Sequence, residues 1–260
     1  MTSVPTEHAV YPYLEEVNQS ILRAVRSLAA TSPTLRVLDV GCGFGALGQE
    51  FRRLGIEVWG IERDHTAVTL ASKRLDRVIE SDLADTDVIG RELDGTRFDL
   101  VVFSDVLEHT PDPRSVVGAY TPYLADTGRV IVSVPNVANW QTRLALLAGR
   151  FTYKDTGVLD RTHLRFFTKR STVEFIGSCG LQVQSVDFTP MLVRAVLPAV
   201  KRNIRERAAG DVETNVLSDS PLYRLYLRVV LPVERLLVRL APGLLAFQIV
   251  VTAGRGGPSA

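Results

Sequence analysis

The stretch that decides the fold is VLDVGCGFG, which runs from Val37 to Gly45. In this stretch an apolar run is followed by three glycines at every second position. This pattern is typical of a strand that ends in a loop that binds a nucleotide-like ligand. Further apolar runs follow at the spacing of strands that alternate with helices, at residues 58–62, 77–81, 98–104 and 129–134. Because these runs are continuous, they predict a parallel sheet that is covered on both faces.

Composition and charge narrow the class of protein. Lys and Arg number 30 against 29 Asp and Glu, so the chain has no overall charge signature of nucleic-acid binding. Its two cysteines, Cys42 and Cys179, lie far apart, which predicts no disulfide and fits a reducing compartment. The N-terminus lacks the pattern of a signal peptide, and the uncharged stretch Leu240–Gly254 is too short to span a bilayer. We expect a cytoplasmic protein, with a peripheral position at the inner membrane face as the alternative.

Four segments are expected along the chain: a helical lid (1–33), a ligand-binding core (34–190), a helical insertion (191–245), and a last strand with a tail (246–260). Helical spacing of apolar residues begins at Leu14 in the first segment. The insertion is rich in Leu, Val and Arg, and Pro232 is expected to break it into two helices. It could cover the substrate, form a dimer interface or lie on a membrane surface.

The glycine loop alone does not identify its ligand. Gly41, Gly43 and Ala46 match the dinucleotide pattern, and Glu62 stands where an acid that binds ribose is expected. Both NAD and S-adenosylmethionine carry such a ribose. Asp39 separates them, because a carboxylate at the strand end would repel a pyrophosphate and attract the ammonium and sulfonium of S-adenosylmethionine. An NAD-dependent dehydrogenase is therefore the least favoured of the functions considered for this chain.

Acidic residues also end two later strands. Ser81-Asp82-Leu83 closes the third strand, where an acid can accept the adenine amino group while the leucine packs on the ring. SDVLEH, residues 104–109, closes the fourth strand at the edge where open α/β sheets bind ligands. These residues favour S-adenosylmethionine as the cofactor.

Taken together, the motifs resemble a known family. VLDVGCGFG, Glu62, SDL, FDLVVFSDVLEHTPDP and GRVIVSVPN stand in the order typical of class I S-adenosylmethionine-dependent methyltransferases, closest to the branch similar to ubiquinone-biosynthesis O-methyltransferases. Residues 135–151 and 158–168 resemble the type 23 subgroup. The resemblance covers roughly residues 35–188 and the last strand. It implies an α/β, Rossmann-like, doubly wound sheet of seven strands, mostly parallel, with an antiparallel last strand at 246–253 and helical additions at the N-terminus and before that strand.

The same resemblance implies roles for the cofactor-binding residues. The glycines let the backbone approach the methionine end, Glu62 grips both ribose hydroxyls, Asp82 and Leu83 hold adenine, and Ser104 lines the face of methyl transfer. Cys42 is expected only to fit the loop, without a redox role. The candidates are Asp39, Gly41, Cys42, Gly43, Gly45, Glu62, Arg63, Asp82, Leu83, Ser104 and Asp105. S-adenosylhomocysteine would be the product.

Methyl transfer to a hydroxyl profits from a general base, and histidine suits that task near neutral pH. We predict His163 as the base and His109 as the second choice, although each could instead hold its loop in place. Asp160 could orient His163 or bind a substrate hydroxyl. Asp105, Glu108 and both histidines could be combined into a metal site, but their spacing matches no metal motif, so no metal is expected.

The methyl acceptor is the least explicit feature. The fourth strand lacks the Asn/Asp-Pro-Pro-aromatic motif of enzymes that methylate planar nitrogens, which argues against DNA. The polar loop at 152–165 and the resemblance to type 23 relatives favour a small hydroxyl-rich molecule, namely a sugar, glycoside or polysaccharide precursor. The alternatives are an RNA or protein methyltransferase that uses the Arg-rich C-terminal region, and a catalytically silent partner. The chain would act as a monomer or homodimer.

Overall fold

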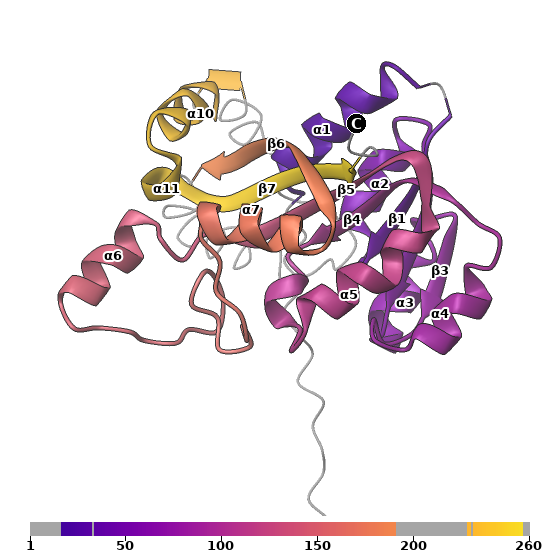
Figure 1. The fold of residues 1–260 in the computed structure, drawn as a ribbon, viewed down its shortest axis with the longest axis horizontal. Helices are drawn as coiled ribbons and strands as arrows, with labels where there is room; N and C mark the ends of the chain where they lie inside the picture. Colours follow the sequence, from indigo (N-terminus) through magenta and orange to yellow (C-terminus); the bar gives the residue numbers. More distant parts are fainter. Residues whose placement is uncertain (1–16, 33, 191–227, 230, 257–260) are drawn as a thin grey trace, which may run out of the picture.

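A seven-stranded sheet forms the centre of the computed structural model, which describes residues 17–32, 34–190, 228–229 and 231–256 (Figure 1). The strands are β1 (Arg36–Val40), β2 (Glu57–Glu62), β3 (Arg77–Glu80), β4 (Phe98–Ser104), β5 (Leu124–Pro135), β6 (Leu181–Pro190) and β7 (Ala246–Arg255). Their order is β3-β2-β1-β4-β5-β7-β6, and β7 runs antiparallel to both of its neighbours. The predicted Rossmann-like sheet with its antiparallel last strand is confirmed.

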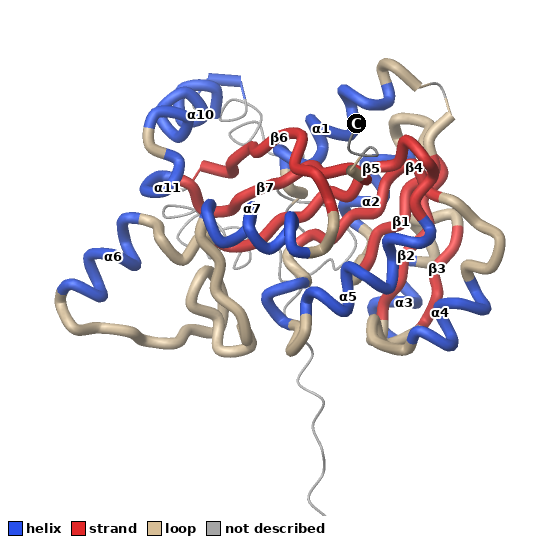
Figure 2. The backbone as a smooth tube through the Cα atoms, viewed as in Figure 1, coloured by secondary structure: helices blue, strands red, loops and turns tan. Residues whose placement is uncertain are grey.

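Helices cover both faces of this sheet, as Figure 2 shows. One apolar cluster joins the sheet to α1 (Gln19–Ala29), α2 (Ala46–Arg52) and α3 (His65–Ala71). A second cluster joins its other face to α4 (Thr86–Glu92), α5 (Pro113–Tyr120) and α7 (Lys169–Ser178). Because both faces are covered, the central strands are apolar throughout, which explains the continuous runs in the sequence.

The N-terminal helix begins later than its apolar spacing predicts. Asn18 caps α1, and its Oδ1 accepts the backbone N–H groups of Ser20 and Ile21 at 3.0 and 3.3 Å. A side chain that accepts hydrogen bonds from these backbone N–H groups marks the N-terminal end of the helix. Residues 14–16 of the predicted helix lie outside the described residues. The buried side of α1 packs on the sheet, and whether residues 1–33 act as a lid stays a prediction.

The fifth strand begins earlier than predicted. Helix α5 ends at Tyr120, because Pro122 has no N–H for a further helical hydrogen bond. A short 3₁₀ turn, η2 (Thr121–Tyr123), and then β5 follow, so this strand starts five residues before the apolar run that begins at Arg129. Helix α4, whose N-terminus is capped by Asp85, precedes β4.

The expected helical insertion is described only in its last part, since residues 191–227 and 230 lie outside the described residues. Helix α10 (Leu231–Leu240) begins with Pro232 in its first turn, a position that proline favours, and α11 (Pro242–Leu245) leads into β7. Helix α6 (Trp140–Leu147) precedes the long loop that returns to α7. Within the described segments, no helix combines the length and the apolar character needed to cross a bilayer. The dimer and membrane-surface roles stay predictions.

Candidate active site

The glycine loop after β1 depends on backbone conformations that other residues avoid. Gly41, Gly43 and Gly45 have φ angles of +73°, +53° and +78°, in the left-handed region. A Cβ atom at Gly41 would lie 2.7 Å from Cγ2 of Val106, which follows β4. A side chain at position 41 would therefore displace Val106. The glycine loop and the turn after β4 pack directly against each other.

Glu62 ends β2 and is bound to this loop. Its Oε2 accepts the N–H of Gly43 at 3.0 Å, and its Oε1 accepts those of Arg63 and Asp64 at 2.8 and 3.0 Å. The side chain is buried, so these charge-assisted bonds hold the carboxylate in one orientation beside the glycines. Its contact with the ribose hydroxyls stays a prediction.

Asp39 is a buried carboxylate at the end of β1. Among the described residues its Oδ2 has no hydrogen-bond partner, and burial, followed by the charge of Glu62, raises the pKa of Asp39 to about 7. An unpartnered buried acceptor is costly unless a ligand satisfies it. The predicted contact of Asp39 with the ammonium or sulfonium of S-adenosylmethionine stays a prediction.

The expected adenine-binding residues lie at the end of β3. Asp82 is exposed, and its Oδ2 lies 3.7 Å from Nη1 of Arg63. The Leu83 carbonyl accepts the Tyr120 hydroxyl at 3.2 Å, which fixes the chain where the leucine side chain packs on the core. These residues stand on the rim beside Glu62, as the sequence predicts, while the contact with adenine itself stays a prediction.

Cys42 has a packing role in the glycine loop. It is buried, and its Sγ would lie 2.6 Å from a Cβ atom placed on Gly60 of β2. Burial raises the pKa of the Cys42 thiol, which disfavours the reactive thiolate. This geometry explains why a glycine stands at position 60, and the absence of a redox role for Cys42 stays a prediction.

The turn after β4 brings a second loop into the site. Ser104 ends the strand, Asp105 follows, and the 3₁₀ turn η1 (Leu107–His109) carries the next side chains inward. The Glu108 carbonyl accepts the backbone N–H groups of Leu164 and Arg165 at 2.8 and 3.0 Å. These two bonds dock the loop between α6 and α7 on the turn, so residues far apart in the sequence meet there.

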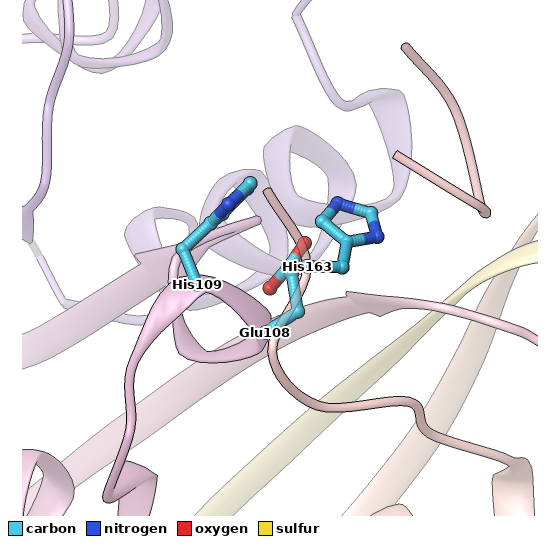
Figure 3. Close-up of side chains that lie close together, drawn as sticks. All are labelled: Glu108, His109 and His163. Carbon is cyan, nitrogen blue, oxygen red and sulfur yellow. The ribbon is translucent and has the colours of Figure 1, made fainter. Parts of the chain in front are cut away.

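His109 and His163 meet at this junction, with ring centroids 4.7 Å apart and ring planes at 71° (Figure 3). The Nδ1 of His163 lies 3.1 Å from the Val158 carbonyl, and that of His109 lies 3.3 Å from the Thr162 carbonyl. A carbonyl only accepts, so each Nδ1 carries the proton and each Nε2 keeps its lone pair. Burial lowers the pKa of both histidines, and for His109 the neighbouring His163 adds to it.

Asp160 is hydrogen-bonded within the loop. Its Oδ1 accepts the backbone N–H and the hydroxyl of Thr162 at 2.8 and 2.7 Å, whereas the Nδ1 of His163 faces Val158. The Thr162 hydroxyl lies 3.1 Å from Nδ1 of His109. Asp160 is thus linked to His109 through Thr162, and its predicted roles, to orient His163 or to bind a substrate hydroxyl, stay predictions. Nothing in the sequence marks Thr162, because threonine is common in polar loops.

Glu108 completes the cluster. It is fully buried, and neither carboxylate oxygen has a hydrogen-bond partner in the part of the chain that the structure describes. Burial, and then the charge of Asp105, raises the pKa of Glu108 well above its usual value. Ligand atoms of Glu108, His109 and His163 lie within 4.8 Å of one another, a set that can hold a divalent cation. Asp105, the fourth residue considered for a metal site from the sequence, is bonded to Gln248 instead. The absence of a metal stays a prediction.

A comparison with protein families decides what this site belongs to. The model of a family described as a methyltransferase domain matches residues 13–186, more than half of the chain. The chain belongs to this methyltransferase family. The predicted class, an S-adenosylmethionine-dependent methyltransferase with S-adenosylmethionine as its cofactor, is thereby confirmed.

Curated relatives match part of this methyltransferase chain. The ubiquinone biosynthesis O-methyltransferase of Alkalilimnicola ehrlichii is 36% identical over 127 residues, which are 47% of this chain and 51% of that protein. The protein of the same name from Ralstonia nicotianae is 28% identical over 192 residues, 71% of this chain and 79% of its own. The match to the first of these relatives thus spans about half of its length.

Solved structures share the fold of this methyltransferase. An S-adenosylmethionine-dependent methyltransferase from Archaeoglobus fulgidus has a TM-score of 0.54 and 16% identity, with 90% of this chain and 92% of that chain covered. The magnesium protoporphyrin IX methyltransferase of Synechocystis, solved with bound S-adenosylhomocysteine, has a TM-score of 0.52 and 15% identity, with 93% and 89% covered. At these identities the likeness shows the fold alone.

Proposed function

We propose that this methyltransferase transfers the methyl group of S-adenosylmethionine to a hydroxyl oxygen of a small molecule, and that this hydroxyl belongs to a phenolic ring. The observation that carries the proposal is the pair of imidazole rings at the turn after β4, each with Nδ1 bound to a carbonyl, so that Nε2 carries no proton. The hydroxyl oxygen attacks the methyl carbon, the carbon–sulfur bond breaks, and Nε2 of His163 takes the hydroxyl proton.

The strength of the base favours a phenol over a sugar. Burial holds the pKa of His163 below its ordinary 6.5, so its neutral ring is a weak base. A phenol such as the tyrosine side chain has a pKa of about 10, whereas an alcohol-like hydroxyl lies near that of water, about 15.7. Proton transfer is most effective where the two pKa values are close. The sugar, glycoside or polysaccharide hydroxyl expected from the sequence is the poorer match.

The surroundings of His163 also suit a planar ring. Phe166 lies 6.4 Å from the His163 ring, and Phe151 lies 5.9 Å from Phe166 and 5.4 Å from Tyr153, between ring centroids. All three aromatic side chains are exposed by about a third to a half, so they offer surface for a ring to pack against. The names of the two relatives, which place them in ubiquinone biosynthesis, support an acceptor ring of this kind.

The Glu108 carboxylate favours a second way to activate the same hydroxyl. Glu108 and the Nε2 atoms of His109 and His163 would hold a divalent cation, which would supply positive charge to the forming phenolate. In that arrangement the three side chains would hold the cation, which would lower the pKa of the hydroxyl, and the hydroxyl proton would pass to solvent. The acceptor and the bond that forms are the same in both cases.

The test is methyl transfer from radiolabelled S-adenosylmethionine to matched acceptors. We expect methylation of 3,4-dihydroxybenzoate and of a catechol with an alkyl chain, and none of monosaccharides or RNA. Methylation of sugars alone would overturn the phenolic acceptor. Transfer to RNA would favour the alternative based on the Arg-rich region, most of which lies outside the described residues. Binding of S-adenosylhomocysteine without turnover on any acceptor would point to a catalytically silent partner.

A further inference from the structure

Asp105 adopts a backbone conformation that non-glycine residues avoid. Its φ angle is +56°, and no other described residue except glycine has a positive φ. The residue links β4 to η1, so its conformation sets the direction in which the chain carries Glu108 and His109. Such a conformation persists only where the surroundings fix it, and it is often found at functional sites.

The Asp105 carboxylate is held from two neighbouring strands. Nε2 of Gln248, on β7, lies 2.6 Å from both of its oxygens, and the Ser133 hydroxyl, on β5, donates to Oδ1 at 3.0 Å. The backbone N–H of Asp105 donates to the Ser133 carbonyl at 3.1 Å. Both the side chain and the backbone of the strained residue are therefore fixed to the sheet.

The network continues to the N-terminal helix. Oε1 of Gln248 accepts Nδ2 of Asn18 at 3.2 Å, while Oδ1 of Asn18 caps α1. Gln248 and Asn18 are 2% and 5% exposed, so water does not replace these bonds. The carboxylate can only accept, which fixes the Gln248 amide with its nitrogen toward Asp105 and its oxygen toward Asn18. Three distant segments thus share one buried network with a defined direction.

We propose that Gln248 and Asn18 are positioning residues for methyl transfer, which act through Asp105 to hold η1 and its His109 against His163. Neither residue faces the reacting atoms. The proposal rests on the proposed function in so far as the two histidines act on the acceptor. It assigns a catalytic purpose to the antiparallel strand and to the cap of α1, both outside the glycine loop.

Two variants break the network at different points. Asn18→Asp keeps the oxygen that caps α1 and removes the donor to Gln248, whereas Gln248→Met keeps the length of the side chain and removes both polar atoms. Ser20→Ala is the matched control, because it removes a different hydrogen bond of α1, the one to the Phe188 carbonyl at 3.1 Å, and leaves the network intact. The double variant Asn18→Asp/Asp105→Asn reverses the direction of the Gln248 amide and restores a hydrogen bond from Gln248 to each of positions 18 and 105.

The chain has four histidines, so their ring resonances can be resolved by NMR and assigned with single His→Gln variants. We expect the His109 and His163 resonances to shift in Asn18→Asp and Gln248→Met, to return in the double variant, and to stay in place in Ser20→Ala. On 3,4-dihydroxybenzoate, kcat should fall roughly tenfold to a hundredfold in the two network variants, with a smaller change in KM.

Unmoved histidine resonances in both network variants, or an equal fall in kcat in Ser20→Ala, would overturn the proposal. The resonance measurement needs no acceptor. If the wild-type protein methylates nothing, the proposed function fails, and the position of the two rings still decides this inference.

Discussion

The imidazole rings of His109 and His163 lie edge to face with their centroids 4.7 Å apart, although each belongs to a different loop. The loops are joined by backbone bonds, since the Glu108 carbonyl accepts N–H groups from Leu164 and Arg165. Replacement of either ring therefore leaves the junction in place. The role of each histidine in methyl transfer can therefore be tested by substitution of its side chain.

We expect His163→Gln to lower turnover on a catechol by about a hundredfold or more, because positioned bases contribute factors of about 10² to 10⁴. The affinity for S-adenosylhomocysteine, measured by calorimetry, should stay within about twofold, because the glycine loop is untouched. His65→Gln is the control, since that ring is exposed on α3 and pairs with Glu80. Unchanged turnover in His163→Gln would remove this residue from the mechanism.

Thr162→Val tests the link between Asp160 and His109. Valine has nearly the shape of threonine but cannot bond Asp160 or Nδ1 of His109, so the ring loses one of its two acceptors. We expect turnover to fall about tenfold while stability changes by about 1 kcal/mol. Thr121→Val, which removes a hydroxyl bond to the Val117 carbonyl at the C-terminal end of α5, is the matched control. Equal rates for Thr162→Val and the wild type would show that the link does not serve catalysis.

The sequence could predict both histidines because position along the strands restricts where loops meet. SDVLEH follows β4 on the rim where parallel strands end, and the polar loop with His163 follows the next strand. The partners of this site could not be predicted. Val158 and Thr162 bond the two rings and Gln248 bonds Asp105, through contacts that only the folded chain brings together, and their residue types carry no signal of their own.

The acceptor shows a different limit of sequence analysis. The loop at 152–165 is polar in composition, which led to the expectation of a sugar. In the structure, Phe166 lies next to His163, and Phe151 packs against both Phe166 and Tyr153, while the polar residue Asp160 is buried and bonded within the loop. Composition counts residues without their exposure, so it could not show which side chains remain to meet a substrate.

Glu108 is the basis of a prediction about metal binding. Its carboxylate is buried without a hydrogen-bond partner among the described residues, and two imidazole nitrogens lie beside it. We expect Mn²⁺ or Zn²⁺ to raise the Tm of the wild type, and EDTA to reverse the rise, because a ligand of the folded state stabilises it. Glu108→Gln should abolish the effect, whereas the exposed Glu92→Gln should retain it. An identical shift in both variants would place the cation elsewhere.

Asp39 links cofactor binding to pH. Burial, and then the charge of Glu62, raises its pKa from 3.8 to about 7, so the folded state holds the proton more tightly than the unfolded state. Stability from this group is therefore present at low pH and is lost as the pH rises from about 4 through about 7. Above that, the buried charge costs roughly 4 kcal/mol. A cation of the cofactor would offset this cost, and its binding would release the proton from Asp39.

The affinity for S-adenosylmethionine should accordingly fall about tenfold for each pH unit below about 7 and level off above it. Calorimetry in two buffers with different ionisation enthalpies should show release of about one proton per cofactor on the acidic side. Asp39→Asn should bind weakly with no such pH dependence, and the exposed Asp94→Asn should behave as the wild type. A pH-independent affinity in the wild type would mean that the Asp39 carboxylate does not meet the cofactor's positive charge, and the identification of its orphaned oxygen as a cation partner would fail.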